Sequence, residues 1–142
     1  MNGGATAVRS LDEAARGFLG TPFRLHGRDP ATGLDCVGLV LASLAACRLP
    51  APPVLHYGLA QAAIDHLLPL ARTAGLVSGD PDASGAILLL APGPARHHLA
   101  IRTRGGFVHA HAGLRRVVET PGDPPWPLLA GWHAPTRSQG TD

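Results

Sequence analysis

The spacing of apolar residues along the chain changes near Gly85, from a helical period to short runs of strand length. Before Gly85 the pattern predicts helices over residues 10–19, 36–46 and 59–74, the last kinked or divided at Pro69. After Gly85, apolar runs predict strands over residues 87–90, 99–101, 107–110, 114–119 and 131–133. This order indicates an α+β domain, with N-terminal helices packed on a meandering antiparallel sheet.

The first two predicted helices have clear boundary signals. Ser10 and Glu13 form a capping box, in which each side chain satisfies a backbone donor at the helix start. Gly20-Thr21-Pro22 is expected to end this helix. Four of its apolar side chains should face inward: Ala14, Ala15, Phe18 and Leu19. Pro50 follows the second helix, which cannot continue through it.

Length and composition favour a single domain over residues 1–142, with a core over about 8–135 and a disordered polar tail from residue 136. The net charge of +2 gives no reason to expect nucleic acid as a partner. Residues 1–9 lack the features of an export signal, and no apolar stretch is long enough to span a membrane. We therefore expect synthesis in the cytoplasm without a signal peptide.

Cys36 is the strongest candidate for chemistry. It follows a loop rich in Gly and Pro and precedes an apolar run, which places it at a helix start. Free N–H groups there are expected to lower the thiol pKa, so Cys36 should be alkylated faster than Cys47 at neutral pH. A buried structural thiol is the alternative, and it is our interpretation of Cys47. Two cysteines are also too few for a disulfide framework.

Histidines on the predicted strands supply partners for a Cys-His hydrolase. The neighbours His97 and His98 point to opposite faces of a strand, so only one of them can face Cys36. His109 and His111 are two residues apart and share a face. The histidines of this half of the chain also raise the alternative of a zinc site, although the His-Glu-x-x-His spacing is absent.

Three motifs in order resemble those of NlpC-type peptidases, which are papain-like cysteine hydrolases that cut peptidoglycan stem peptides. Residues 20–30 and 33–40 are similar to the first motif, G-T-P-Y-x-x-G-G-x-x-P-x-x-G-x-D-C-S-G-L-V. Residues 98–101 are similar to the second, H-V-G-I, and residues 105–110 to the third, G-x-F-I-H-A. The resemblance implies a papain-like NlpC fold for nearly the whole chain.

The resemblance also implies roles for the reacting residues. Cys36 matches the family's nucleophile and His98 its base, which leaves His97 facing solvent or a loop. His109 matches the polar residue that orients the imidazole. The implied activity is that of a cysteine peptidase or amidase with a Cys-His-His site, acting on peptidoglycan peptides without a metal or other cofactor.

Phe23, Arg24, Arg28 and Asp35 are the candidate substrate-binding residues. Asp35 is placed either to bind an amino group of the substrate or to cap the helix that follows. Arg24 and Arg28 either bind stem-peptide carboxylates or are simply solvated. Phe23 replaces the family's usual Tyr and Val37 its common Ser, which affects specificity more than catalysis.

Gly27-Arg28-Asp29-Pro30 resembles the branch of the family found in the tails of phages and gene-transfer agents. A tail would carry an enzyme without an export signal to the cell wall, so tail proteins are expected partners. The alternative is a non-catalytic tail-tip structural protein that keeps the fold. An acyltransferase of the related lipid-modifying group is disfavoured, because in those relatives His precedes Cys.

Overall fold

The computed structural model describes residues 10–50, 76–94 and 96–133. The helix predicted over residues 59–74, with its kink at Pro69, lies outside the described residues, and so do the terminal segments 1–9 and 134–142. Within the described ranges, no helix has both the length and the apolar character needed to cross a membrane.

Helix α3 (Cys36–Ala46) has the predicted bounds, whereas α2 (Leu11–Arg16) ends earlier than predicted. The Glu13 carboxylate accepts hydrogen bonds from the backbone N–H (3.1 Å) and the hydroxyl (2.8 Å) of Ser10, so the expected start of α2 is confirmed. After α2 the chain turns away, and Gly20 donates its backbone N–H to the carbonyl of Val117. Leu19 is therefore 41% exposed rather than turned inward.

The main sheet has six strands in the order β3-β8-β4-β5-β6-β7, and all neighbours are antiparallel. Their bounds are β3 (Val77–Ser78), β4 (Ile87–Gly93), β5 (Arg96–Arg102), β6 (Gly106–His111), β7 (Arg116–Pro121) and β8 (Leu128–His133). The α+β prediction is confirmed, and each predicted strand is present. Strand β3 was not predicted, because its two residues are exposed and carry no apolar run.

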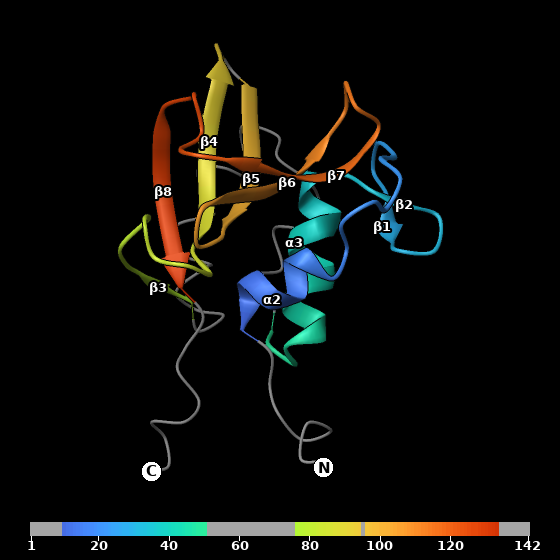
Figure 1. The fold of residues 1–142 in the computed structure, drawn as a ribbon, viewed down its shortest axis with the longest axis horizontal. Helices are drawn as coiled ribbons and strands as arrows, with labels where there is room; N and C mark the ends of the chain where they lie inside the picture. The colour runs from blue at the N-terminus through green and yellow to red at the C-terminus, as the bar shows by residue number, and fades with distance from the viewer. Residues whose placement is uncertain (1–9, 51–75, 95, 134–142) are drawn as a thin grey trace.

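The connections of the sheet differ from a simple meander at one end. Strands β4 to β7 follow each other as neighbours, but β8 returns beside β4 instead of pairing with β7 (Figure 1). A separate two-stranded hairpin, β1 (Arg28–Asp29) and β2 (Gly33–Leu34), lies in the loop that was predicted to deliver the chain to Cys36.

Apolar side chains form a cluster on each face of the sheet. The larger cluster lies between the sheet and helices α2 and α3 and includes Leu39, Leu44, Leu99 and Val108. A smaller one occupies the opposite face and is made of Ala86, Leu88, Leu90, Ala100 and Phe107, with Trp126 packed against it. Burial on both faces explains why the predicted run at residues 87–90 is continuously apolar.

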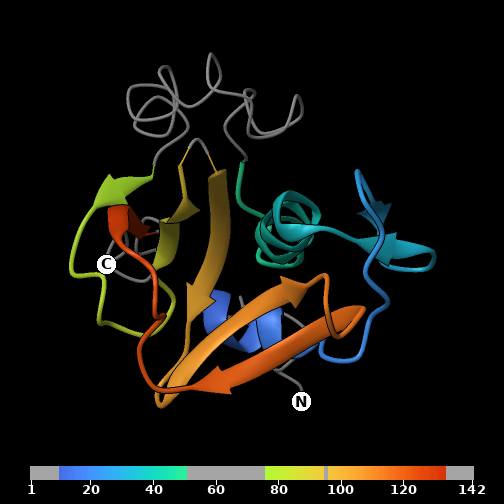
Figure 2. The ribbon, with the colours of Figure 1, turned by 90° about the horizontal axis from the view of Figure 1, so that it is seen from above.

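Strands β5 and β6 separate soon after they meet. They pair only at Ile101 with Val108 and at Arg102 with Phe107. Beyond these pairs the two strands diverge, with the start of α3 beside them (Figure 2). This separation leaves room for side chains from β5, β6 and α3 to meet, and it places the candidate site.

Arg102 connects β5 to two surface loops. Its side chain is 9% exposed and donates hydrogen bonds to the carbonyls of Pro81 (3.2 Å) and Gly122 (3.3 Å). It also forms ion pairs with Asp82 and Asp123, whose side chains are 79% and 86% exposed. Exposed ion pairs contribute little to the free energy of unfolding. Arg102 therefore stabilises the fold mainly through its buried aliphatic stem and its hydrogen bonds to the two carbonyls.

We expect Arg102→Ala to lower the free energy of unfolding by about 2–3 kcal/mol, because it removes these bonds and a buried stem. Asp123→Asn, the matched control, should cost less than about 1 kcal/mol, because it removes only an exposed ion pair. Urea unfolding followed by circular dichroism measures both. Equal effects of the two substitutions would contradict this account.

Candidate active site

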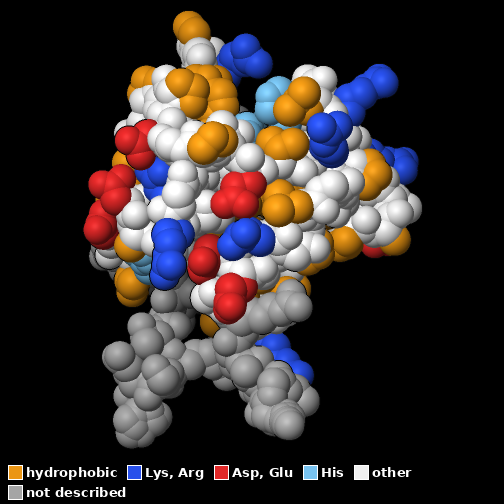
Figure 3. Space-filling model, in the orientation of Figure 1, with side chains coloured by type: hydrophobic (Ala, Val, Ile, Leu, Met, Phe, Trp, Pro, Cys, Tyr) orange, Lys and Arg blue, Asp and Glu red, His pale blue; other side chains and the backbone are white. Residues whose placement is uncertain are grey.

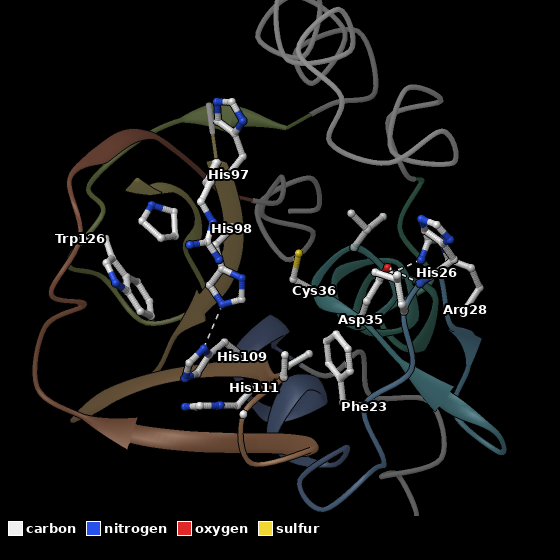
Figure 4. Close-up of a pocket in the computed structure, with 17 residues that line it drawn as sticks. Phe23, His26, Arg28, Asp35, Cys36, His97, His98, His109, His111 and Trp126 are labelled. Atoms are coloured by element: carbon white, nitrogen blue, oxygen red, sulfur yellow. Dashed lines mark hydrogen bonds and ion pairs between the residues drawn. The ribbon is translucent and has the colours of Figure 1, made fainter. Parts of the chain in front are cut away.

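A cavity of about 680 Å³ lies where β5, β6 and the start of α3 come together. Cys36, His98 and His109 all line it, so the structure brings the three predicted catalytic residues to one place (Figure 4). Figure 3 shows a histidine side chain at the surface near the top of the molecule, among hydrophobic side chains and with basic side chains nearby. The cavity therefore combines a thiol, imidazoles and apolar walls.

Cys36 is the first residue of α3 and is partly buried. The helix begins there because the Asp35 carboxylate accepts a hydrogen bond of 2.8 Å from the backbone N–H of Gly38. Cys47 lies at the other end of the helix and is fully buried in the larger cluster, as expected of a core residue.

Burial raises the pKa of the Cys36 thiol to about 11. The backbone N–H groups of Leu99 and Val37 favour the thiolate, but burial and the nearby charge of Asp35 outweigh them. The expectation of a lowered pKa from the helix start is therefore wrong. The thiol is protonated at neutral pH, so Cys36 needs a base in order to act as a nucleophile.

His98 is hydrogen bonded to His109. The distance between His98 Nε2 and His109 Nδ1 is 2.9 Å, and His109 Nε2 lies 3.2 Å from the Thr120 hydroxyl. If His98 Nε2 carries the proton of this bond, His109 Nε2 carries the next and donates to Thr120. His98 Nδ1 is then the unprotonated nitrogen, and in the view of Figure 4 the His98 ring lies between His109 and Cys36.

Both histidines of this pair are neutral at neutral pH. Burial lowers the pKa of His98 to about 4, and that of His109 to about 4 as well. The neighbouring His111 contributes to both shifts in the same direction. Although Cys36 and His98 are both among the described residues, no hydrogen bond joins them, so the resting site holds a neutral thiol beside a neutral base.

His97 occupies the rim of the cavity. Figure 4 shows its ring turned away from Cys36, as strand alternation requires once His98 points inward. Among the described residues, no group of three or more His, Cys, Asp or Glu side chains is arranged to hold a metal ion.

The Asp35 carboxylate accepts hydrogen bonds from three donors, and one of these bonds caps helix α3. Its Oδ1 accepts from Gly38 N–H and from the Arg28 guanidinium (2.7 Å), and its Oδ2 accepts from the backbone N–H of His26 (2.9 Å). The capping interpretation is thus confirmed. Arg28 lines the cavity but is already paired with Asp35, so its charge is largely neutralised.

The remaining loop candidates differ in position. Phe23 lines the cavity and packs against the larger cluster. Arg24 is exposed and is not one of the described residues that line the cavity. Its predicted contact with substrate is therefore not supported by its place in the structure.

Trp126 and Arg96 line the cavity and were missed by the sequence reasoning. Arg96 begins β5, two residues before His98, so a longer predicted strand would have included it. Trp126 lies in the loop between β7 and β8, where no pattern of spacing connects it to the histidines. Its indole is 5.5 Å from the ring of His98, measured between ring centroids.

We expect alkylation of Cys36 by iodoacetamide to be slow at pH 7 and to rise about tenfold per pH unit up to its pKa, because the thiolate is the reacting form. Cys36 should still react faster than Cys47, which has no exposed surface. Mass spectrometry of the Cys47→Ala variant, which has a single thiol, measures this rate. A rate that levels off between pH 7 and 8 would contradict a raised pKa.

Comparison with solved structures identifies the fold of this chain. No protein-family model and no curated protein sequence matches the chain. Among solved structures, it is similar to the P60 domain from M. avium subspecies paratuberculosis antigen MAP1204, with a TM-score of 0.53 and 18% identity over 94% of this chain and 97% of that one. The chain has the NlpC/P60 fold. The NlpC/p60 domain of peptidoglycan hydrolase SagA is also similar, with a TM-score of 0.49 and 22% identity over 85% of this chain and 90% of that one.

The NlpC/P60 fold agrees with the fold that the sequence motifs imply. At 18% identity the likeness establishes the arrangement of helices and strands and nothing about substrate. The chemistry of this NlpC/P60 fold must therefore be argued from Cys36, His98 and their surroundings.

Proposed function

We propose that this protein is a cysteine peptidase that hydrolyses peptide bonds in peptidoglycan stem peptides. The observation that carries the proposal is the meeting of the Cys36 thiol with the His98–His109 pair in one cavity. The resemblance of the three motifs supports peptidoglycan as the substrate, and the NlpC/P60 fold agrees with the fold that they imply.

The first half of the reaction forms an acyl-enzyme. As Cys36 Sγ bonds to the carbonyl carbon of the scissile amide, its proton passes to His98 Nδ1 and the carbonyl oxygen takes up negative charge. The tetrahedral intermediate then collapses. The C–N bond breaks, and the His98 proton goes to the departing amine.

The second half releases the acyl group. Water adds to the thioester carbon while His98 takes one of its protons, and the C–S bond breaks as the proton returns to sulfur. Because the resting thiol and imidazole are both neutral, the thiol proton must pass to His98 for sulfur to attack as a nucleophile. His109 keeps the His98 ring in the required tautomer through the 2.9 Å bond.

We assign substrate contacts to Asp35, Arg28 and Phe23, which line the cavity. Asp35 and Arg28 are paired, so this wall offers a carboxylate that can accept one further hydrogen bond and a guanidinium with N–H groups left to donate. Phe23 contributes apolar surface without the hydroxyl that the family's Tyr carries.

Digestion of purified peptidoglycan, followed by mass spectrometry of the released peptides, tests the proposal. We expect new peptide termini within the stem peptide, none with Cys36→Ala, and no change on adding zinc or a chelator. Intact stem peptides after digestion with folded wild-type protein would overturn the proposal and favour the non-catalytic tail-tip protein. Loss of cleavage with chelator and its return with zinc would favour a metal enzyme.

We further propose that the protein is made in the cytoplasm and carried to the cell wall in a phage-like tail. The resemblance of the motif over residues 27–30 to the tail branch of the family supports this. Immunoblots of purified tail particles test it. Particles without the protein, with the protein only in the free cytoplasmic fraction, would remove the tail assignment and leave the peptidase chemistry unaffected.

A further inference from the structure

Trp126 contacts the histidine pair but has no role in the chemistry described above. Its ring meets that of His98 at 82° and that of His109 at 63°, with centroid distances of 5.5 Å and 5.9 Å. In the view of Figure 4 the indole lies on the side of His98 opposite to Cys36. The indole therefore packs against one side of the His98 imidazole, and both rings line the cavity that holds the thiol.

The indole is anchored in place by the sheet. Trp126 packs against the cluster on the face opposite the helices, and its ring lies 6.3 Å from that of Phe107 at 73°. Phe107 in turn lies 4.8 Å from His109, on the same strand. Trp126, Phe107 and the two histidines thus form one aromatic cluster.

The charged and titratable groups around His98 offer no anion to hold it. His109 and His111 face it from β6, and Cys36 faces the cavity from α3 with the paired Asp35 and Arg28 beside it. From β4 the opposite residue is Leu90. On its own strand, the adjacent titratable groups are Arg96 and His97, at the rim.

An imidazole held only by another neutral imidazole needs protection, because water competes for the same nitrogens. A carboxylate partner would resist this competition through its charge, and none is hydrogen bonded to either ring among the described residues. In other triads a carboxylate holds the imidazole in place through its charge. In this site the packing around the His98–His109 pair must do so instead.

We propose that Trp126 is a positioning residue, whose indole covers the His98–His109 hydrogen bond from water and holds His98 with Nδ1 towards Cys36. The catalytic consequence rests on the proposed peptidase function, whereas the covering of the histidine pair does not. Trp126 contacts His98 on the side opposite to Cys36 and forms no bond with the substrate during the reaction.

Burial is the largest cause of the lowered pKa of both histidines, so removing the indole should raise both values. Titration of the histidine side chains by NMR measures this without any turnover. The signals are assigned with His98→Gln and His109→Gln. We expect Trp126→Ala to move the pKa of the pair upward from about 4 by about one pH unit or more, and Trp126→Phe to move it less.

Two further variants keep the test decisive. Trp132→Phe loosens a buried tryptophan on β8 and should leave the titration unchanged. Trp126→Leu keeps an apolar side chain against Phe107 but uncovers part of the pair, so it should show the upward shift even if Trp126→Ala does not fold. An unchanged titration in Trp126→Leu, or an equal shift in Trp132→Phe, would overturn the proposal.

Kinetics on a peptide substrate then distinguish positioning from substrate contact. We expect Trp126→Leu to lower kcat and to move the acid limb of the kcat/KM profile to higher pH, in step with the NMR titration. A raised KM with an unmoved pH profile would make Trp126 a wall of the substrate site and overturn its positioning role. A wild-type protein without peptidase activity would refute the proposed function while leaving the NMR result to decide the covering role.

Discussion

Replacing Cys36 with Ala is expected to reduce kcat/KM for stem-peptide cleavage by at least about a thousandfold, to the background of the assay. The substitution removes the sulfur that forms the acyl-enzyme in the proposed mechanism, and no other described residue of the cavity carries a thiol. Cleavage of peptidoglycan fragments measured by liquid chromatography gives the rate. The fold should persist, because the helix cap at Asp35 does not involve the Cys36 side chain.

Cys47→Ala is the matched control for this experiment. Cys47 is buried in the core at the far end of α3, so its replacement should keep kcat/KM and lower the free energy of unfolding only slightly. If Cys36→Ala retained activity while Cys47→Ala lost it, Cys36 could not be the nucleophile.

His98→Ala is expected to reduce kcat/KM by about a thousandfold or more, whereas His97→Ala should keep it within about threefold of wild type. Only His98 is hydrogen bonded to His109 and turned towards the thiol, while His97 points away at the rim. The two variants are of equal size and adjacent in sequence, so each is the control for the other. The reverse pattern of losses would mean that the base lies on the other face of β5.

His109→Ala should lower kcat/KM by about a hundredfold, which is less than the loss expected for His98→Ala. It removes the hydrogen-bond partner of His98 Nε2 but leaves the proposed base itself. Its loss should lie mainly in kcat, because His109 is 3% exposed and offers little surface to a substrate. A loss as large as that of His98→Ala would instead assign His109 a direct part in proton transfer.

The sequence was sufficient for the local features of this protein. Helix α3 begins at Cys36 because Asp35 caps it and an apolar run follows, and both are interactions between neighbours along the chain. Alternation along a strand puts His97 and His98 on opposite faces, and the resemblance to the second motif then indicated His98. The motifs implied the fold that comparison with solved structures supports.

Features that depend on contacts between segments far apart in the sequence could not be predicted from local sequence patterns. The return of β8 beside β4 and the two-residue strand β3 depend on pairing between segments far apart in the sequence. The early end of α2 is similar, because the chain after it turns to bond with Val117 on β7. Whether Arg24 or Arg28 reaches the cavity depends on the β1–β2 hairpin, which pairs Arg28 with Leu34.

The protonation state of Cys36 shows most clearly what the sequence indicates and what only the tertiary structure decides. A helix start favours the thiolate, and that much is visible from the position of Cys36 in the sequence. The tertiary structure buries the thiol beside Leu99 and Asp35 and raises its pKa, because losing water costs the charged form more than the helix start returns. The sequence thus indicated the catalytic candidates Cys36, His98 and His109, and packing between distant segments decided their protonation states and which other side chains line the cavity.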